Sequence, residues 1–267
     1  MTTQLTQSVL KALRDYIDKN ECGLKLKAQY FDGISSASTE AQKLGQWFEF
    51  KATGALPPYG DKNVPQPNLL KSGKLSTSYA RMEAQVLNFK KLLSAYDVKI
   101  ISVGDENFNY GQARGTPDII AEIDGELSII DIKASGLIRD KWSEFGWENI
   151  ANSYKPKMKI ITQAVHYKYI AKNLYKKDDV PFYFWVFSTT NQDDYRIIKV
   201  ELDDDEYALH QQELSDAIRF LAKEEKRGFK AHPSLKRCRG CALAKTCAYA
   251  SPIAEIEEVY YSSAITT

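Results

Sequence analysis

The sequence predicts an α/β fold in which helices flank a central mixed β-sheet. Three observations support this prediction: apolar residues recur at helical spacing in several segments, short β-rich runs lie between those segments, and no internal repeat or low-complexity tract is present. With 267 residues, of which 43% are hydrophobic and 27% charged, the chain has the composition of an ordinary globular protein. It is also long enough to bury a sizeable core.

The expected elements follow from the spacing of apolar residues along the chain. Helical periodicity predicts helices at residues 3–19, 39–52, 75–96, 156–175 and 203–227. Runs rich in β-branched and aromatic residues predict strands at residues 98–103, 118–123, 127–132, 181–188 and 195–201. The proline-rich stretch 54–72 is predicted to be an extended loop.

The charge of the chain is balanced overall and uneven locally. The 36 Lys and Arg residues against 35 Asp and Glu argue against a uniformly basic nucleic-acid coat, so a polyanion would have to bind at local patches. Seven lysines and no acid lie between Lys155 and Lys177, and nine basic residues against two acids lie between Arg219 and Lys245. Both phosphate-binding surfaces and ordinary solvated helix faces have this composition.

Several other protein classes lack their sequence signals here. No stretch approaches the roughly 18 apolar residues of a membrane helix, and the amphipathic N-terminus lacks the continuous apolar run of a signal peptide. We therefore expect a cytoplasmic protein with no membrane partner. Gly73-Lys74 is followed by Leu75, where a phosphate-binding loop needs Ser or Thr, and no G-x-S-x-G element is present.

The three histidines are His166, His210 and His232, and none has metal-ligand spacing. We expect His166 to face outward beside Tyr167.

The cysteines are more informative, because three of them form a C-x2-C-x5-C run near the C-terminus and the fourth lies near the N-terminus: Cys22, Cys238, Cys241 and Cys247. Disulfides are not expected in a cytosolic chain. The three-plus-one pattern suits the four thiolates of an iron–sulfur cluster, with a zinc site and unligated thiols as alternatives.

A hairpin in the middle of the chain brings ionisable side chains together. Asp124-Gly125 between two apolar runs predicts a two-residue turn. This turn places Asp118 directly opposite Asp131, about 5 Å apart at Cβ, and Lys133 on the same face as Asp131.

Two carboxylates at this distance repel each other unless a divalent cation lies between them. Mg²⁺ and Mn²⁺ prefer such oxygen ligands, and a bound ion activates water and neutralises a phosphate. The neighbouring ammonium of Lys133 would orient the water or offset developing negative charge. The alternative is an ordinary surface ion pair between strands, which is common and contributes little to stability.

The Pro-Asp pair ending at Asp118, followed by Asp131-x-Lys133, resembles the core motif of the PD-(D/E)XK nuclease superfamily. Gln163 and Tyr167, four residues apart on one helical face, resemble the Q-x3-Y motif of its RecB-like branch. In that branch the motif faces the metal site and the DNA strand.

Two further features resemble the same branch. Gly45 followed by Glu49 resembles its first motif, in which many members have His where this chain has Glu49; Glu40 is the alternative. The cysteine pattern resembles that of the RecB-like nucleases with a 4Fe–4S cluster, such as the AddB nuclease domain and the CRISPR-associated iron–sulfur nucleases. In these proteins the four cysteines flank the nuclease core and join its two ends.

The resemblance implies a restriction-endonuclease-like core with an iron–sulfur appendage that joins N- and C-terminal segments. It implies one nuclease domain over residues 1–267, with the catalytic core at 97–202 and the cluster and first-motif segments at 22–52 and 228–250. Mg²⁺ or Mn²⁺ would be held by three carboxylates and one backbone carbonyl: Glu49, Asp118, Asp131 and Ile132. Lys133 would position the attacking water, and Gln163 and Tyr167 would orient Lys133 or the scissile strand.

The activity that the resemblance implies is metal-dependent exonucleolytic trimming of DNA ends in recombination, replication, repair or CRISPR adaptation, with a helicase, recombination or integration protein as partner. The alternatives are a sequence- or structure-specific endonuclease and a non-catalytic DNA-binding scaffold with a structural cluster. Trp142, Phe145 and Trp147 follow the hairpin. They would either stack on unpaired bases or pack on the core.

Overall fold

A computed structural model of the chain describes residues 4–34, 38–57, 63–143, 145–152, 161–238 and 240–249. The chain divides into two compact units. We call the first, Met1–Lys11 with Ser38–Leu221, the sheet unit, and the second, Ala12–Ala37 with Ala222–Thr267, the cysteine unit.

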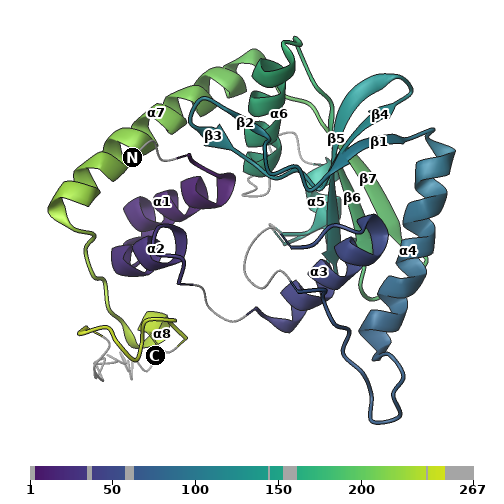
Figure 1. Cartoon of the computed structure of the whole chain (residues 1–267), viewed down its shortest axis with the longest axis horizontal. Helices are drawn as coiled ribbons and strands as arrows, with labels where there is room; N and C mark the ends of the chain where they lie inside the picture. Colours follow the sequence, from purple (N-terminus) through teal and green to yellow (C-terminus); the bar gives the residue numbers. More distant parts are fainter. Residues whose placement is uncertain are drawn as a thin grey trace, which may run out of the picture. The chain divides into compact units, whose positions relative to one another are not determined.

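Within the described residues, a five-stranded mixed sheet forms the centre of the sheet unit, with the strand order β1-β4-β5-β6-β7 (Figure 1). The strands are β1 (Lys99–Val103), β4 (Ile119–Ile123), β5 (Glu126–Ser135), β6 (Phe182–Ser188) and β7 (Tyr195–Val200). Neighbouring strands are antiparallel except β5 and β6, which are parallel. A parallel pair requires a crossover, which here includes α5 (Trp147–Asn152) and α6 (Ile161–Tyr175). The predicted mixed sheet flanked by helices is confirmed.

The hairpin β4–β5 has the predicted turn and register. Ile119 pairs with Ile130, and Ile123 pairs with Glu126, so that Asp124 and Gly125 form the turn. Both turn residues have positive φ, 52° and 80°. This conformation suits an Asp-Gly hairpin turn whose twist matches that of the strands.

Two helices cover one face of the sheet and form its main hydrophobic core. They are α3 (Glu40–Thr53), which begins in a capping box and ends at a left-handed glycine, and α4 (Thr77–Ala95). Phe48 of α3 packs edge-on against Phe187 at 5.1 Å between ring centroids, and Phe89 of α4 packs on Trp185 at 5.7 Å. Ile130 and Ile132 of β5 belong to this core, so the side chain between them points to the opposite face.

The opposite face is covered by α6. Its residues Ala164, Ile170 and Ala171 are fully buried, as are Phe182 and Phe184 of β6. A small hairpin, β2 (Asn109–Tyr110) with β3 (Ala113–Arg114), contributes further packing beside α6, and the sequence did not predict it. The predicted helix 156–175 is observed from Ile161, and residues 153–160 lie outside the described residues.

The cysteine unit contains two short helices that the sequence did not predict, α2 (Gly23–Tyr30) and α8 (Leu235–Cys238). The helices α1 (Gln7–Lys19) and α7 (Asp204–Arg227) each contribute residues to both units. Tyr16 donates a hydrogen bond to Glu224 at 2.7 Å and accepts one from the Lys230 amide at 3.2 Å. Among the described helices, none combines the length and the hydropathy needed to cross a bilayer.

Candidate active site

Asp118 lies immediately before β4, on the strand next to Asp131. Its Oδ2 accepts a hydrogen bond from the Ile132 amide at 2.7 Å, and its backbone carbonyl accepts one from Gly104 at 3.1 Å. The carboxylate is therefore held across the hairpin, beside the strand that carries the second acid.

Asp131 is completely buried in the interior of β5. Its Oδ1 accepts a hydrogen bond from Gln163 Nε2 of α6 at 2.5 Å. Its Oδ2 forms an ion pair with Lys133 and accepts no directional hydrogen bond. The Lys133 side chain is 27% exposed, whereas the Asp131 side chain is fully buried. A buried acid in this position argues against the alternative of an ordinary surface ion pair.

Glu49 is the third acid of this group and comes from α3. Burial raises its pKa to about 7; the ammonium of Lys133 opposes this effect and the charge of Asp131 adds to it. The Glu49 carboxyl group therefore interacts electrostatically with both Lys133 and Asp131. Glu40, the alternative first-motif residue, is exposed and pairs with Lys43 at 2.7 Å within the same helix. We call Glu49, Asp118, Asp131 and Lys133 the carboxylate site.

The electrostatics of the carboxylate site favour an additional positive charge. Burial raises the pKa of Asp118 well above its usual range, and the charges of Asp131 and Glu49 raise it further. Burial also raises the pKa of Asp131, and Lys133 offsets only part of this effect. Burial lowers the pKa of Lys133, but the three carboxylates raise it by more, so the ammonium stays charged. Three acids thus share one cation.

The carboxylate oxygens of the carboxylate site are the kind of ligand that a hard divalent ion such as Mg²⁺ prefers. The site offers three carboxylates, and the Oδ2 atom of Asp131 lacks a directional partner. In the part of the chain that the structure describes, however, no three His, Cys, Asp or Glu side chains are already arranged as a metal site. One of the two carboxylate oxygens of Asp118, Oδ2, accepts a hydrogen bond from the Ile132 amide.

Comparison with protein-family models identifies the family of the chain. Residues 63–248 match the family described as the PD-(D/E)XK nuclease superfamily. The chain belongs to this superfamily. No curated protein sequence matches the chain.

The fold of this PD-(D/E)XK protein also resembles solved structures. A candidate exonuclease from Eubacterium rectale superposes with a TM-score of 0.55 at 15% identity, covering 97% of this chain and 91% of that chain. The alkaline exonuclease LHK-Exo from Laribacter hongkongensis gives a TM-score of 0.47 at 17% identity, covering 84% of this chain and 90% of that chain. At these identities the likeness concerns the fold alone.

In this PD-(D/E)XK fold, Tyr167 holds the segment that leads into Asp118. Its hydroxyl donates a hydrogen bond to the Thr116 carbonyl at 3.0 Å. Its ring lies so close to Gly115 that a Cβ there would meet Cε1 at 2.5 Å. Burial raises the pKa of Tyr167, and the charges of Asp131 and Asp118 raise it further, so it remains a neutral donor. Tyr167 thus contacts the backbone of this segment, whereas Gln163 contacts Asp131 directly.

The expectation that His166 faces outward is wrong. His166 is completely buried; its Nε2 lies 2.9 Å from the Arg114 carbonyl and its Nδ1 lies 3.0 Å from Nε2 of His210. Burial, together with His210, lowers the pKa of His166 to about 4, so the ring is neutral. His210 in turn lies 3.5 Å from Glu213. Helical spacing did not reveal this contact, because His210 comes from α7, forty-four positions along the chain.

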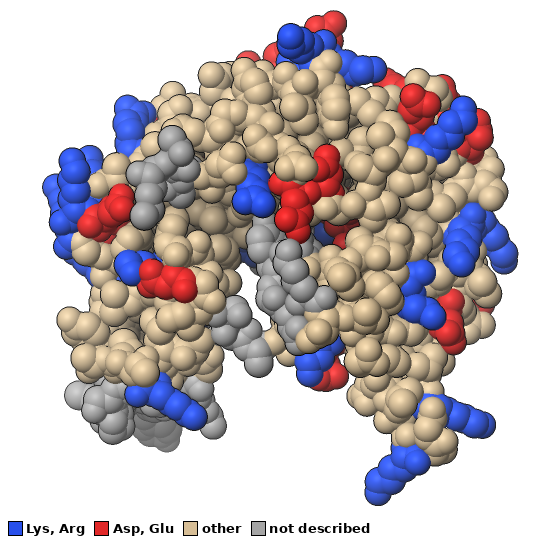
Figure 2. Space-filling model, viewed as in Figure 1, with Lys and Arg blue, Asp and Glu red and all other residues tan. Residues whose placement is uncertain are grey.

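The basic stretch between Lys155 and Lys177 is not one continuous surface. Its first three lysines lie in the undescribed segment 153–160. Lys168 is completely buried and pairs with Asp179 at 2.9 Å, so it is not available to a phosphate. Lys and Arg are interspersed with Asp and Glu over the face shown in Figure 2, in agreement with the balanced total charge.

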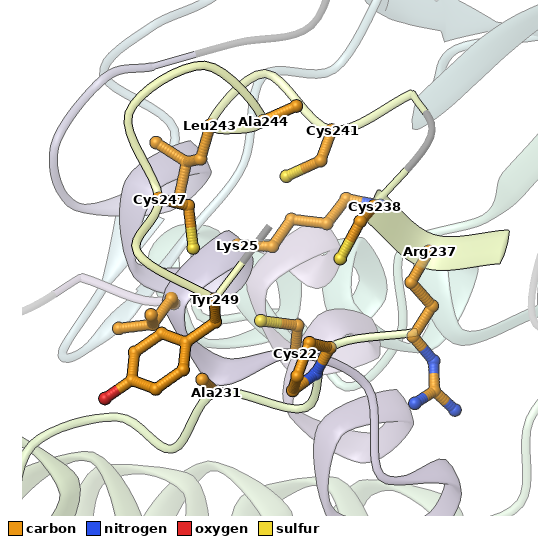
Figure 3. A pocket seen from close by; sticks show the side chains of 12 residues that line it. Cys22, Lys25, Ala231, Arg237, Cys238, Cys241, Leu243, Ala244, Cys247 and Tyr249 are labelled. Carbon is orange, nitrogen blue, oxygen red and sulfur yellow. The ribbon is translucent and has the colours of Figure 1, made fainter. Parts of the chain in front are cut away.

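The four cysteines line one pocket of the cysteine unit (Figure 3). Cys22 precedes α2, Cys238 ends α8, and the turns that follow carry the other two, with Cys241 donating its amide to the Cys238 carbonyl at 3.1 Å. All four are free, partly exposed thiols. Lys25 and Arg237 also line the pocket. The thiols thus converge, although they are not arranged as a ready metal site.

The raised pKa of Glu49 predicts a pH-dependent stability for the metal-free protein. Because the folded state binds the Glu49 proton more tightly than the unfolded chain, stability falls as pH rises from the ordinary value of 4.5 through about 7. Glu49→Gln should raise the free energy of unfolding at pH 8 by ~1–3 kcal/mol. The gain should disappear toward pH 4.5. Urea unfolding in chelator at pH 5 and pH 8 measures this difference.

The control for this experiment is Glu40→Gln, which removes an exposed acid from the same helix. It should change stability equally at both pH values. A Glu49→Gln effect that is the same at pH 5 and pH 8 contradicts the prediction.

Gly115→Ala should disturb the carboxylate site through Tyr167. The added Cβ would overlap the ring, so that either the ring or the segment leading into Asp118 must move. We expect a loss of ~1–3 kcal/mol in the free energy of unfolding, measured by urea titration. Gly45→Ala, whose Cβ would meet nothing within 4 Å on α3, is the matched control and should not destabilise the protein. Equal stabilities of the two variants would contradict the assigned contact.

Proposed function

We propose that this chain is a divalent-metal-dependent deoxyribonuclease that removes nucleotides from DNA ends. The observation that carries the proposal is the charge of the carboxylate site, where one fully buried acid, Asp131, and two partly buried acids, Glu49 and Asp118, share one ammonium group. Such an excess of negative charge is stabilised by a divalent cation. Membership of the PD-(D/E)XK nuclease superfamily supports the reaction class.

The proposed metal ligands are three carboxylates and one backbone carbonyl: Glu49, Asp118, Asp131 and Ile132. Bound Mg²⁺ or Mn²⁺ would lower the pKa of a water molecule and neutralise the scissile phosphate. Lys133 remains protonated beside the carboxylates, so it serves as a cation and hydrogen-bond donor rather than as a proton acceptor. In this role it orients the attacking water or stabilises the charge that develops on the phosphate.

Gln163 and Tyr167 act as positioning residues in this proposal. Gln163 donates to Asp131 and keeps one carboxylate oxygen oriented, which leaves the other for Lys133 and the ion. Tyr167 fixes the backbone before Asp118 through the Thr116 carbonyl. These contacts support a role toward the two acids more directly than the expected role toward Lys133 or the DNA strand.

We propose DNA ends as the substrate because one solved structure with a similar fold is described as an exonuclease. A helicase, recombination or integration protein would be the kind of partner that supplies such ends. An endonuclease is the alternative, and closed circular DNA separates the two, because an end-dependent enzyme leaves closed circles intact. A cytoplasmic location remains a prediction from the sequence.

We further propose that the cysteine pocket holds a 4Fe–4S cluster. The three-plus-one spacing of the cysteines and their convergence on one pocket support this proposal (Figure 3). Lys25 and Arg237 line the same pocket, where their positive charges would offset the negative charge of a cluster held by four cysteines. The cluster would join segments from the two ends of the chain within the cysteine unit.

Substitutions in the carboxylate site should abolish metal-dependent cleavage. Asp118→Asn and Lys133→Ala should each lower the rate by about 100-fold or more, because each removes a group that acts on the reacting phosphate or its ion. Activity should vanish in chelator and return with Mg²⁺ or Mn²⁺. The measurement is digestion of 5′- and 3′-end-labelled single- and double-stranded DNA, with closed circular DNA alongside.

Glu40→Gln is the control for these variants and should cleave at the parental rate. Unchanged cleavage by either carboxylate-site variant would refute the proposed active site. Discrete fragments from closed circles would instead favour the endonuclease alternative.

The cluster proposal predicts a coloured protein. Anaerobically purified protein should be brown, with broad absorption near ~400 nm, and should contain iron and sulfide. Cys241→Ser should lose most of this colour while the sheet unit retains its secondary structure by circular dichroism. A colourless protein that contains zinc or no metal would rule out the cluster.

A further inference from the structure

We propose that Arg114 binds a backbone phosphate of the DNA strand at a position away from the scissile bond. The proposal rests on the proposed nuclease function and adds a second contact with the same substrate. The site is a surface hollow of the sheet unit, which we call the β2–β3 hollow. The described residues that line it are Gln4, Gly111, Gln112 and Arg114.

The guanidinium of Arg114 lacks an internal partner. In the described part of the chain, its Nε atom is buried and makes no hydrogen bond, and no carboxylate forms an ion pair with it. Among the same residues, Arg196 also has a buried Nε without a hydrogen bond, but its Nη2 donates to Glu148 at 2.9 Å. Buried polar groups in folded proteins normally find such partners. An anion from outside the chain would supply the missing acceptors for Arg114.

The backbone of Arg114 is held from both sides of the residue. Its amide donates to the Leu5 carbonyl at 2.9 Å, and its carbonyl lies 2.9 Å from Nε2 of His166. A carbonyl can only accept, so Nε2 of His166 carries the hydrogen. The neighbouring Ala113 is completely buried and forms a bridge with Leu5. Because the backbone is fixed and Nε is buried, the Arg114 side chain loses less conformational entropy when it binds an anion.

The lining of the β2–β3 hollow suits a phosphate. The described side chains that line it are one guanidinium and two amides, with no acid and no apolar group among them. Guanidinium and amide N–H groups donate to phosphate oxygens. Gly111 adds no side chain, and a Cβ there would meet nothing within 4 Å, so the hollow is open at this turn. The core of a protein interface is instead apolar, which favours a nucleic acid over a protein partner.

One turn of α6 places Arg114 close to the carboxylate site. The β2–β3 hairpin lies against α6 (Figure 1), where His166 contacts the Arg114 carbonyl. Gln163, three positions earlier, contacts Asp131. Side chains at this spacing share one helical face and lie about 5–6 Å apart at Cβ. Along the chain, Arg114 precedes Asp118 by four positions, so their Cα atoms are at most about 14 Å apart.

This separation matches the length of a short piece of DNA strand. At about 3.4 Å per nucleotide of a stacked strand, 14 Å corresponds to about four nucleotides. A strand whose scissile phosphate occupies the carboxylate site would therefore have another phosphate within reach of Arg114. Such a contact positions the strand and does not read its sequence.

The test measures binding of a fluorescently labelled single-stranded oligonucleotide to the full-length Asp118→Asn protein, so that the DNA is not consumed. Arg114→Gln should weaken binding about 10- to 100-fold at low salt, as loss of one charge-assisted hydrogen bond predicts. The slope of log Kd against log salt concentration should fall by about 0.7, as expected for one phosphate contact with a single strand. Arg114→Lys should restore the slope. Arg81→Gln, which removes a half-buried arginine from α4 on the other face of the sheet, is the matched control and should bind like the parent.

Substitutions of Gln112 test the same hollow with Arg114 in place. Its side chain is exposed, and its backbone carbonyl accepts from the Leu5 amide at 2.7 Å, so side-chain changes should preserve the fold. Gln112→Glu would offer Arg114 an internal carboxylate and should weaken binding about 10-fold. Gln112→Lys should strengthen binding and steepen its salt dependence. If Arg114→Gln does not fold, equal affinities of these two variants would overturn the proposal.

Oligonucleotides with a single uncharged methylphosphonate linkage, scanned along the strand, distinguish a phosphate contact from general charge attraction. At one position the uncharged linkage should weaken parental binding and should not weaken Arg114→Gln binding further. A loss that is the same at every position would overturn the proposal. Parental affinity and salt dependence of Arg114→Gln would also overturn it and would favour an acidic protein partner for the hollow.

The two proposals fail separately. Position-specific phosphate binding through Arg114 without any cleavage by the parental protein would refute the nuclease function and support the Arg114 site. Metal-dependent cleavage by the parent with no effect of Arg114→Gln on binding would do the reverse.

Discussion

Asp131 lies in the interior of β5, between two isoleucines that face the hydrophobic core, and its carboxylate is shielded from solvent. A buried charge in this position destabilises the fold unless other groups compensate it. Lys133 supplies an ion pair and Gln163 a hydrogen bond. Two further acids, Asp118 and Glu49, add negative charge to the same region. The elements around Asp131 therefore supply both the groups that compensate its charge and the acids that add to it.

Helix α6 contacts both the strand that carries Asp131 and the segment that leads into Asp118. One turn of the helix provides Gln163, His166 and Tyr167, which contact Asp131, the Arg114 carbonyl and the Thr116 carbonyl. The helix therefore fixes the strand that carries one acid and the segment that leads into the other. The Q-x3-Y pattern therefore has a structural role in addition to any contact with a ligand. Residues four apart lie on the same face of a helix, so Gln163 and Tyr167 can reach two neighbouring segments of the chain.

Much of the fold and of the carboxylate site follows from local sequence. The Asp124-Gly125 turn sets the register of the hairpin, and the period of two then sets which side chains share a face. By contrast, helical periodicity says which face of α6 is apolar but not what lies against it. Helical spacing therefore predicts an outward-facing His166, although it is buried against His210. Lys168, in a stretch whose composition suits either a phosphate-binding surface or a solvated face, is also buried and pairs with Asp179. The short elements α2, β2 and β3 have too few residues for a periodic signal.

The sequence by itself determined the superfamily motif, the hairpin that pairs two acids with a lysine, and the C-x2-C-x5-C run, because each depends on spacing within a short segment. The convergence of Cys22 on that run was decided by the tertiary structure. Only the tertiary structure decided that Glu49 interacts electrostatically with Asp131 and Lys133 while Glu40 is exposed. It likewise decided that Tyr167 holds the backbone before Asp118, and that Trp142 is exposed while Trp147 is buried. These outcomes depend on which distant segments pack together. Burial and partner choice arise from that packing, and no local pattern encodes them.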